Sequence, residues 1–212
     1  MQTKKLTFYD IFYTFIFGCV FGWIIEGIWT YIKKGLLINH SALVLGPFNL
    51  IYGVAASLLT LLLHKIKESD YLKIFITSFI TGTILEYIVS FLMEHVLGIM
   101  AWNYSTKFMN INGRVCLQYS IFWGILGLIW IKLIYPYLKK LINKIPRKWG
   151  EITKKVLIVF LIIDSMLTLL AINRATKEVK GIPPANIVDK SLDKLFGYDY
   201  LNNMFNYKWK IK

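Results

Sequence analysis

The chain has 212 residues, of which 56% are hydrophobic and 16% aromatic, and its mean hydropathy is +0.52. A soluble domain of this length would need an implausibly large core to bury so much apolar surface, so the composition excludes a soluble fold and indicates a lipid bilayer around the chain. The formal net charge of +13 also occurs in nucleic-acid-binding proteins, but the basic residues lie between apolar runs, as membrane-flanking charges do. We therefore expect no nucleic-acid partner.

Apolar runs of the right length for membrane spans follow one another along the chain. A hydrocarbon core of roughly 30 Å takes about 20 helical residues. The first run follows Lys4 and Lys5 as a signal peptide would, but it continues through Tyr31 without a small-residue cleavage site, so we expect it to remain as a span. The pattern predicts an all-α polytopic transmembrane helix bundle of about five spans, at residues 10–32, 43–63, 72–93, 115–135 and 156–172.

The chain then divides into two parts by composition. We predict a transmembrane helical domain over residues 1–172 and a polar C-terminal tail over residues 173–212, in which Pro183-Pro184 breaks regular structure. Apolar residues recur at helical spacing over residues 187–205, which indicates an amphipathic helix on the membrane surface, and a solvated tail fits as well. No internal repeat is evident in the sequence.

The distribution of Lys and Arg predicts the orientation. If the N-terminus is cytoplasmic, the inner segments hold twelve Lys and Arg and the short outer loops hold four. The positive-inside rule therefore predicts a multi-pass protein with a cytoplasmic N-terminus, and five spans then place the C-terminus outside.

Ionisable residues within the spans mark the candidate site. Each costs at least about 2.5–3.5 kcal/mol to insert, so it is a functional hypothesis by default. With the predicted orientation, polar groups from four spans reach the outer half of the bilayer, below the polar segment 94–114. The alternative is that Glu26 or Glu86 only joins helices, with Arg114 as its partner. We predict a substrate site formed by Glu26, Tyr52, Glu86, Glu94, Trp102, Tyr104, Asn110, Asn112 and Arg114.

One further carboxylate lies apart from this group. Asp164 stands near the middle of the fifth span, and Arg174 is ten residues away, too far along one helix to pair with it. Asp164 therefore needs another partner or stays protonated, and we assign it a coupling or a structural role.

Motifs for enzymatic chemistry are missing. The sequence has no G-x-x-x-x-G-K-[ST] loop, no G-x-S-x-G elbow, no dinucleotide fingerprint and no H-E-x-x-H pattern, and Cys19 and Cys116 are isolated. We expect no metal site and no cofactor, and any use of ATP would come through a separate subunit. The missing ATPase, hydrolase and metalloprotease motifs favour a protein that is not an enzyme, although they do not decide the question.

Several short strings between residues 10 and 130 form a recognisable series. They are Gly22-Trp23 with Glu26, Gly46-Pro47, Ile51-Tyr52-Gly53, Glu86, Glu94, Trp102 with Tyr104-Ser105, Asn110-Ile111-Asn112-Gly113-Arg114 and Trp123-Gly124, with Asp164-Ser165 and Arg174 beyond them. In these strings the chain resembles one bacterial family, putative ABC-transporter type IV, small membrane proteins found mainly in Gram-positive bacteria. The resemblance implies a permease component in the bacterial cell membrane, with a cytoplasmic ATPase subunit or a second copy of the chain as partner.

Three functions compete on this evidence. The first is a transport protein whose carboxylates bind a cation or an amine, or whose Arg114, Asn110 and Asn112 bind an anionic group. The second is a membrane-embedded enzyme for lipid or envelope precursors, with Glu86 or Glu94 as general base and Arg114 on a phosphate. The third is a scaffold or accessory subunit in which the polar cluster only specifies packing.

Overall fold

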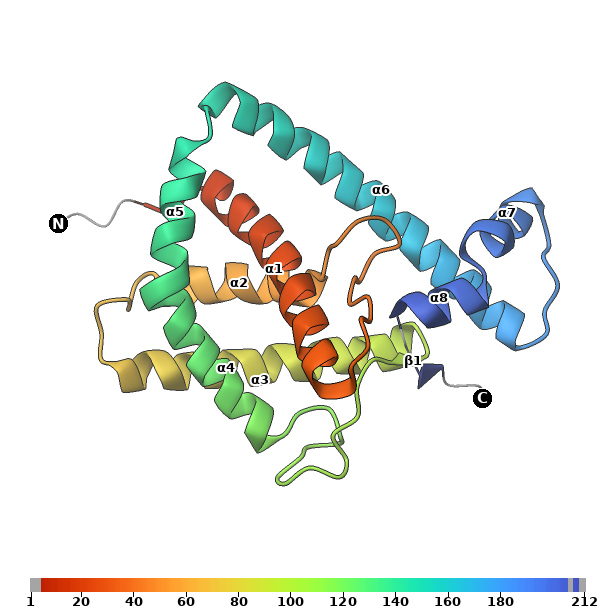
Figure 1. The fold of residues 1–212 in the computed structure, drawn as a ribbon, viewed down its shortest axis with the longest axis horizontal. Coiled ribbons are helices and arrows are strands. Elements are labelled where there is room, and N and C mark those ends of the chain that lie inside the picture. The colour runs from red at the N-terminus through yellow and green to blue at the C-terminus, as the bar shows by residue number, and fades with distance from the viewer. Residues whose placement is uncertain (1–4, 206–207, 210–212) are drawn as a thin grey trace.

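A computed structural model describes residues 5–205 and the backbone of residues 208–209. The fold is all-α apart from a two-stranded antiparallel pairing of Ile99 and Met100 with the strand near the C-terminus (Figure 1). The elements in chain order are α1 (Phe8–Lys34), α2 (Leu50–Leu63), α3 (Tyr71–Val96), β1 (Ile99–Met100), α4 (Leu117–Ile129), the π-helical turn η1 (Trp130–Ile134), α5 (Tyr135–Lys144), α6 (Arg147–Val179), α7 (Ile187–Phe196), α8 (Tyr198–Phe205) and β2 (Lys208–Trp209).

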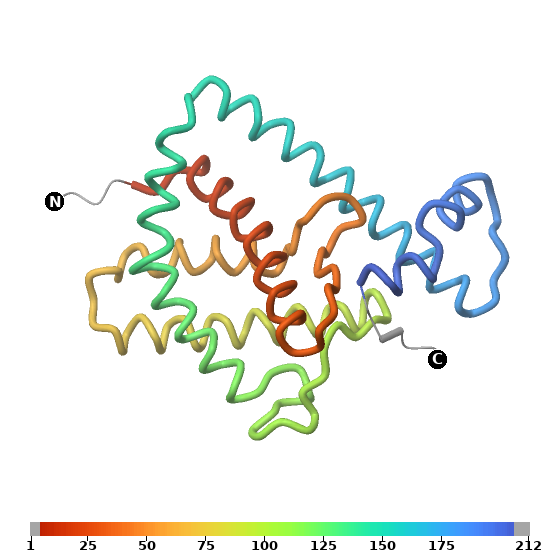
Figure 2. The backbone as a smooth tube through the Cα atoms, in the orientation of Figure 1, coloured from red at the N-terminus to blue at the C-terminus, as the bar shows by residue number. Residues whose placement is uncertain are grey.

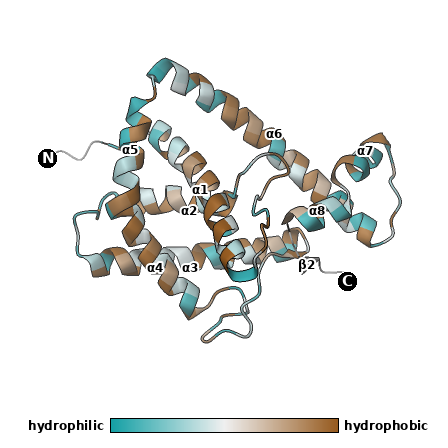
Figure 3. Cartoon of the chain, viewed as in Figure 1, coloured by the Kyte–Doolittle hydropathy of each residue, from teal (hydrophilic) through white to brown (hydrophobic). Residues whose placement is uncertain are grey.

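The long helices confirm a polytopic membrane fold. Four helical stretches are long and apolar enough to cross a bilayer: α1, α3, α6, and α4 with η1 and α5 as one stretch. Hydrophobic residues, brown in Figure 3, recur along each of these helices. The Thr7 side chain accepts a hydrogen bond from the backbone N–H of Asp10 and starts α1, and Gly35, in the left-handed region, ends it. The predicted architecture of about five spans agrees with these helices once α2 is added.

The second predicted span was wrong in its first third. Residues 43–63 were expected to be helical, but the helix covers only Leu50–Leu63, about 21 Å at 1.5 Å per residue. Gly46 has a positive φ and Pro47 follows it, so both interrupt a helix. The chain enters α2 beside the middle of α1, where the backbone N–H of Asn49 donates to Cys19 O at 3.1 Å.

The extended segment before α2 is held by α6, although the two are far apart in sequence (Figure 2). The backbone N–H of Leu45 donates to Asp164 Oδ1 at 3.1 Å, and that of Val44 donates to Thr168 Oγ1 at 3.0 Å. Non-helical backbone at membrane depth is tolerated where its polar groups are satisfied by protein. Asp164 thus finds its partner in a backbone amide, and its side chain is fully buried.

The first helical hairpin, α1 with α2, packs through small residues. A Cβ atom added at Gly18 would lie 2.7 Å from Ala56 Cβ, and one added at Gly53 would lie 2.9 Å from Phe15 O. Such contacts need glycine on one helix so that the two backbones can approach.

The second hairpin, α3 with α4, repeats these contacts at equivalent positions. Gly124 packs on the Phe75 ring as Gly53 packs on Phe15, and Gly127 packs on Ser78 as Ala56 packs on Gly18. The numbers of equivalent residues differ by 60 between α1 and α3 and by 71 between α2 and α4. The chain therefore contains two hairpins built alike and running in the same direction.

The basic segments gather at one end of the bundle, which we call the basic end: residues 5–10, 64–73 and 139–155. Lys139 pairs with Asp10, the guanidinium of Arg147 lies 3.9 Å from the Tyr9 ring centroid, and Tyr13 Oη donates to Gly150 O. Loop 97–116 lies at the opposite, polar end. The predicted cytoplasmic side of the basic end stays a prediction, and Lys4, which contributed to it, lies outside the described residues.

The C-terminal helices pack at the polar end. Arg174 of α6 forms a two-pronged ion pair with Asp193 of α7, at 2.6 and 2.9 Å. Leu201 and Phe205 of α8 join Ile99 in a buried cluster, while α7 exposes Ile187, Val188 and Leu195.

The predicted domain boundary at residue 172 falls inside α6, which continues to Val179.

Replacing Gly22 by alanine should destabilise the first hairpin. A methyl group at Gly22 would overlap the Tyr52 ring, so we expect a loss of about 1–3 kcal/mol, seen as a lower Tm of the purified protein in detergent. Gly27→Ala on the same helix is the matched control, because a Cβ there meets nothing within 4 Å. Equal melting temperatures for the two variants would contradict this packing.

Asp164 should tolerate asparagine better than alanine. Asp164→Ala leaves the Leu45 N–H without its acceptor in a buried place, which costs about 1–3 kcal/mol, whereas Asp164→Asn keeps an acceptor oxygen. Thermal unfolding of both variants in the same detergent measures the difference. An alanine variant as stable as the wild type would show that the contact with Leu45 does not hold the segment.

Candidate functional site

The first carboxylate is positioned by the first hairpin. The ring of Tyr52, on α2, packs against Gly22 of α1. One turn further along α1, Glu26 Oε1 accepts a hydrogen bond from Tyr52 Oη at 2.5 Å. Residues four apart lie on one face of a helix, so the glycine makes room for the ring and the glutamate meets its hydroxyl group.

The second carboxylate is positioned in the same way by the second hairpin. The ring of Trp123, on α4, packs against Gly82 of α3, and its Nε1–H donates to Glu86 Oε2 at 3.2 Å. The other oxygen of Glu86 accepts a hydrogen bond from Tyr104 Oη at 3.0 Å. Glu86 is only 6% exposed, so these two donors satisfy a buried carboxylate.

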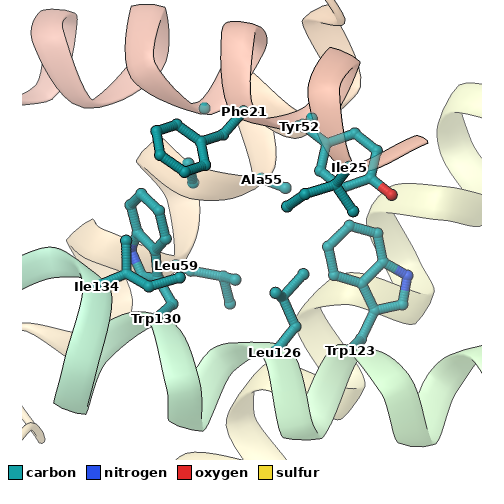
Figure 4. A pocket seen from close by; sticks show the side chains of 12 residues that line it. Phe21, Ile25, Tyr52, Ala55, Leu59, Trp123, Leu126, Trp130 and Ile134 are labelled. Carbon is teal, nitrogen blue, oxygen red and sulfur yellow. The ribbon is translucent and has the colours of Figure 1, made fainter. Parts of the chain in front are cut away.

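The two carboxylate units, Gly22, Glu26 and Tyr52 in the first hairpin and Gly82, Glu86 and Trp123 in the second, share a pattern and lie side by side. Each has glycine and glutamate four residues apart on one helix, and an aromatic residue followed by glycine on the next. The ring centroids of Tyr52 and Trp123 are 6.3 Å apart, and the two carboxylates lie within electrostatic range of each other. Figure 4 shows both rings at one end of an apolar pocket, with the Tyr52 oxygen and the Trp123 nitrogen turned away from it.

Neither carboxylate is paired with a basic side chain. In the described part of the chain, no Lys or Arg forms an ion pair with Glu26 or Glu86. His40 lies near Glu26 and shares a hydrogen bond with Thr30 at 2.7 Å. Burial lowers the pKa of His40, and the nearby Glu26 opposes this effect.

Two further tyrosines, Tyr104 and Tyr119, lie near the carboxylates. Tyr104 stacks on Tyr119 with 4.4 Å between ring centroids, and Tyr119 lies within electrostatic range of both glutamates. Burial and the neighbouring Glu86 raise the pKa of Tyr104, so its hydroxyl group remains a donor to that carboxylate. The sequence analysis missed Tyr119 and Trp123 as site residues. For Trp123 the signal was its place before Gly124, like that of Tyr52 before Gly53.

The predicted site residues of loop 97–116 form a separate unit. Arg114 pairs with Glu94 at 2.5 Å, so the alternative in which it pairs with Glu26 or Glu86 was wrong. Its guanidinium lies 5.6 Å from the ring centroids of Tyr87 and Phe91, and the indole N–H of Trp102 donates to its carbonyl oxygen at 2.8 Å.

The two asparagines of this loop shape its backbone. Asn110 donates to Ser105 O and Lys107 O and accepts from the Gly113 N–H, and Asn112, which has a positive φ, donates to Tyr87 Oη at 2.9 Å. Tyr104 links this unit to the carboxylates, because its backbone N–H donates to Gly113 O while its hydroxyl group reaches Glu86.

Asp164 does not join either unit, since it lies on α6 and holds the segment before α2. Among the described residues, no three His, Cys, Asp or Glu side chains are arranged to hold a metal ion.

Comparison with known proteins gives one match. A family model described as putative ABC-transporter type IV matches residues 13–169, a range that contains both hairpins except the first turn of α1, both carboxylate units and Asp164. No curated protein and no solved structure matches the chain. Because the family model covers more than two thirds of the sequence, the chain belongs to the putative ABC-transporter type IV family.

Proposed function

We propose that this protein is the membrane-spanning permease component of an ABC-type transport system and that it binds a cationic amine between Glu26 and Glu86. The observation that carries the proposal is the pair of equivalent carboxylate–aromatic units on the two hairpins. The family description supports the class of function, and the site geometry supports the charge of the substrate.

The charge argument follows from the partners of the two glutamates. Tyr52, Tyr104 and Trp123 donate hydrogen bonds to them but carry no positive charge. Removing a carboxylate from water costs several kcal/mol unless a cation compensates it, and two neighbouring carboxylates also repel each other. A bound cation would relieve both costs, so the site is suited to a positively charged substrate.

The aromatic residues favour an ammonium group over a metal ion. Faces of Tyr and Trp attract ammonium groups by about 0.5–2 kcal/mol each, and aromatic cages are a common way to bind quaternary ammonium compounds. Four aromatic side chains lie near the carboxylates: Tyr52, Tyr104 and Trp123 direct their polar atoms to them, and Tyr119 stacks on Tyr104.

The geometry gives less support to an anionic substrate at Arg114. The Arg114 side chain is 12% exposed and already pairs with Glu94, and the side-chain amides of Asn110 and Asn112 bind the loop and Tyr87. A phosphate or carboxylate would have to displace these contacts.

The arrangement of the site also fits transport. In many transporters the substrate site lies at the interface between two structural repeats, which then move relative to each other. The proposed site lies between the hairpins α1–α2 and α3–α4 in the same manner. We place the basic end in the bacterial cytoplasm, where Lys5, Lys139 and Arg147 line a surface pocket that a separate ATPase subunit could contact.

In cells, Glu26→Gln and Glu86→Gln should each reproduce the phenotype of a deletion strain. We expect normal amounts of both variants in the membrane of the native host and a metabolite profile like that of the deletion, with Glu68→Gln, 86% exposed, behaving as wild type. Build-up of an unprocessed lipid or envelope precursor would favour the enzyme instead. Wild-type behaviour of both glutamine variants would make the cluster structural.

In vitro, tetramethylammonium should bind the purified protein saturably. We expect Glu26→Gln and Glu86→Gln to weaken binding at least about tenfold, because each removes a charge that contacts the cation, and Glu68→Gln to leave it unchanged. Binding of the radiolabelled compound in nonionic detergent provides the measurement. Absence of saturable binding to the wild type would refute the cation site.

A further inference from the structure

An apolar groove adjoins the proposed site. It lies between α1, α2 and the α4–η1 stretch and encloses a cavity of only about 50 Å³, so it is a shallow groove whose space is mostly its open mouth. Its walls include Phe21, Ile25, Leu59, Leu126 and Trp130, and none of its lining surface is polar. The groove exists because α1 packs along α2 and α3 along α4, which leaves the surfaces of α1 and α4 facing each other without close packing.

The groove and the carboxylates share one wall. Tyr52 and Trp123 line the end of the groove with their ring carbons, while their polar atoms bind Glu26 and Glu86 on the other side (Figure 4). The two rings, with centroids 6.3 Å apart, therefore have the carboxylates on one side and the apolar groove on the other.

The α1 wall of the groove is partly exposed. Phe21 and Ile25 are 41% and 44% exposed, and α1 is one of the helices long and apolar enough to cross the bilayer. Lipid in contact with this face of α1 would give a chain-like molecule a way into the groove that avoids water.

We infer that the ligand is an amphiphilic ammonium compound whose head lies between Glu26 and Glu86 and whose alkyl chain lies in the groove. This inference rests on the proposed cation site and adds the apolar half of the substrate. Charge complementarity selects the head, since two carboxylates repel a phosphate or sulfate headgroup. A neutral acyl chain would gain nothing from them.

The groove contributes selectivity more than affinity. Lipid tails are as apolar as leucine side chains, so an alkyl chain gains little free energy by moving from the bilayer into the groove. The head supplies the binding energy, and the groove decides which chains can accompany it and guides the molecule from the membrane to the carboxylates.

Photo-crosslinking tests where the chain lies. The probe is decyltrimethylammonium with a diazirine in its chain, and the matched control is decyl sulfate with the same diazirine, both applied to the full-length protein in maltoside micelles. We expect the ammonium probe to label Phe21, Ile25 and Leu126 at least about fivefold more than the sulfate probe does. Excess tetramethylammonium and the Glu86→Gln variant should both remove this difference.

Matched variants separate the groove from the head site. Ala55 is 4% exposed and lines the groove, whereas its neighbour Val54 is 43% exposed and does not. We expect Ala55→Leu to lower groove labelling at least about fivefold while tetramethylammonium binding stays within twofold, and Val54→Leu to change neither. Ile25→Trp and Ile24→Trp, at 44% and 41% exposure, form a second pair if Ala55→Leu fails to fold.

The outcomes distinguish this inference from the proposed function. Equal labelling of the groove by both probes would show that it accepts any alkyl chain, and labelling of the ammonium probe outside the groove would place its chain elsewhere. Either result overturns the inference while tetramethylammonium binding leaves the cation site intact. No binding of tetramethylammonium to the wild type would overturn both.

Discussion

The close contact of a glycine with an aromatic ring determines the rest of this structure. Gly22 receives the Tyr52 ring and Gly82 receives the Trp123 ring, so each hairpin brings its two backbones together at one point. A glutamate one turn further along α1 or α3 then faces the polar atom of that ring. Helix packing and the placement of the carboxylates are thus one feature, because moving the ring would also remove the hydrogen bond to the glutamate.

The two units are equivalent in position but not in environment. Glu86 is buried and has two donors, whereas Glu26 is half-buried and has the Tyr52 hydroxyl group. The second donor of Glu86 comes from loop 97–116, which the Arg114–Glu94 ion pair holds in shape. The first hairpin has no such loop, since the extended segment before α2 is turned toward α6 instead. A substrate would therefore meet one rigid carboxylate and one more accessible carboxylate.

Much of this architecture could be predicted from local patterns, and the remainder depends on distant contacts. Apolar length predicts the long helices, and the cost of charge in a bilayer singles out both glutamates. Gly46-Pro47 mark the unwound start of the second span locally, but the groups that satisfy its backbone, Asp164 and Thr168, lie over 100 residues away and could not be predicted. The repeat escaped prediction because Tyr52 corresponds to Trp123 and Gly18 to Ser78, so size and packing are kept while identity is not. Arg114 pairs with Glu94 and not with Glu86, and the conformation of loop 97–116, which the sequence pattern does not give, decides between these two partners.

The short second helix also has an electrical consequence. α2 begins beside Cys19, near the middle of α1, and extends toward the basic end, so the apolar layer between the carboxylates and that end is about as thick as α2 is long. A cation leaving Glu26 and Glu86 in that direction would cross most of the voltage across the membrane in a single step. Each elementary charge moved through that voltage is worth about 2.3 kcal/mol per 100 mV, so the direction of a cation's movement would depend on the membrane potential.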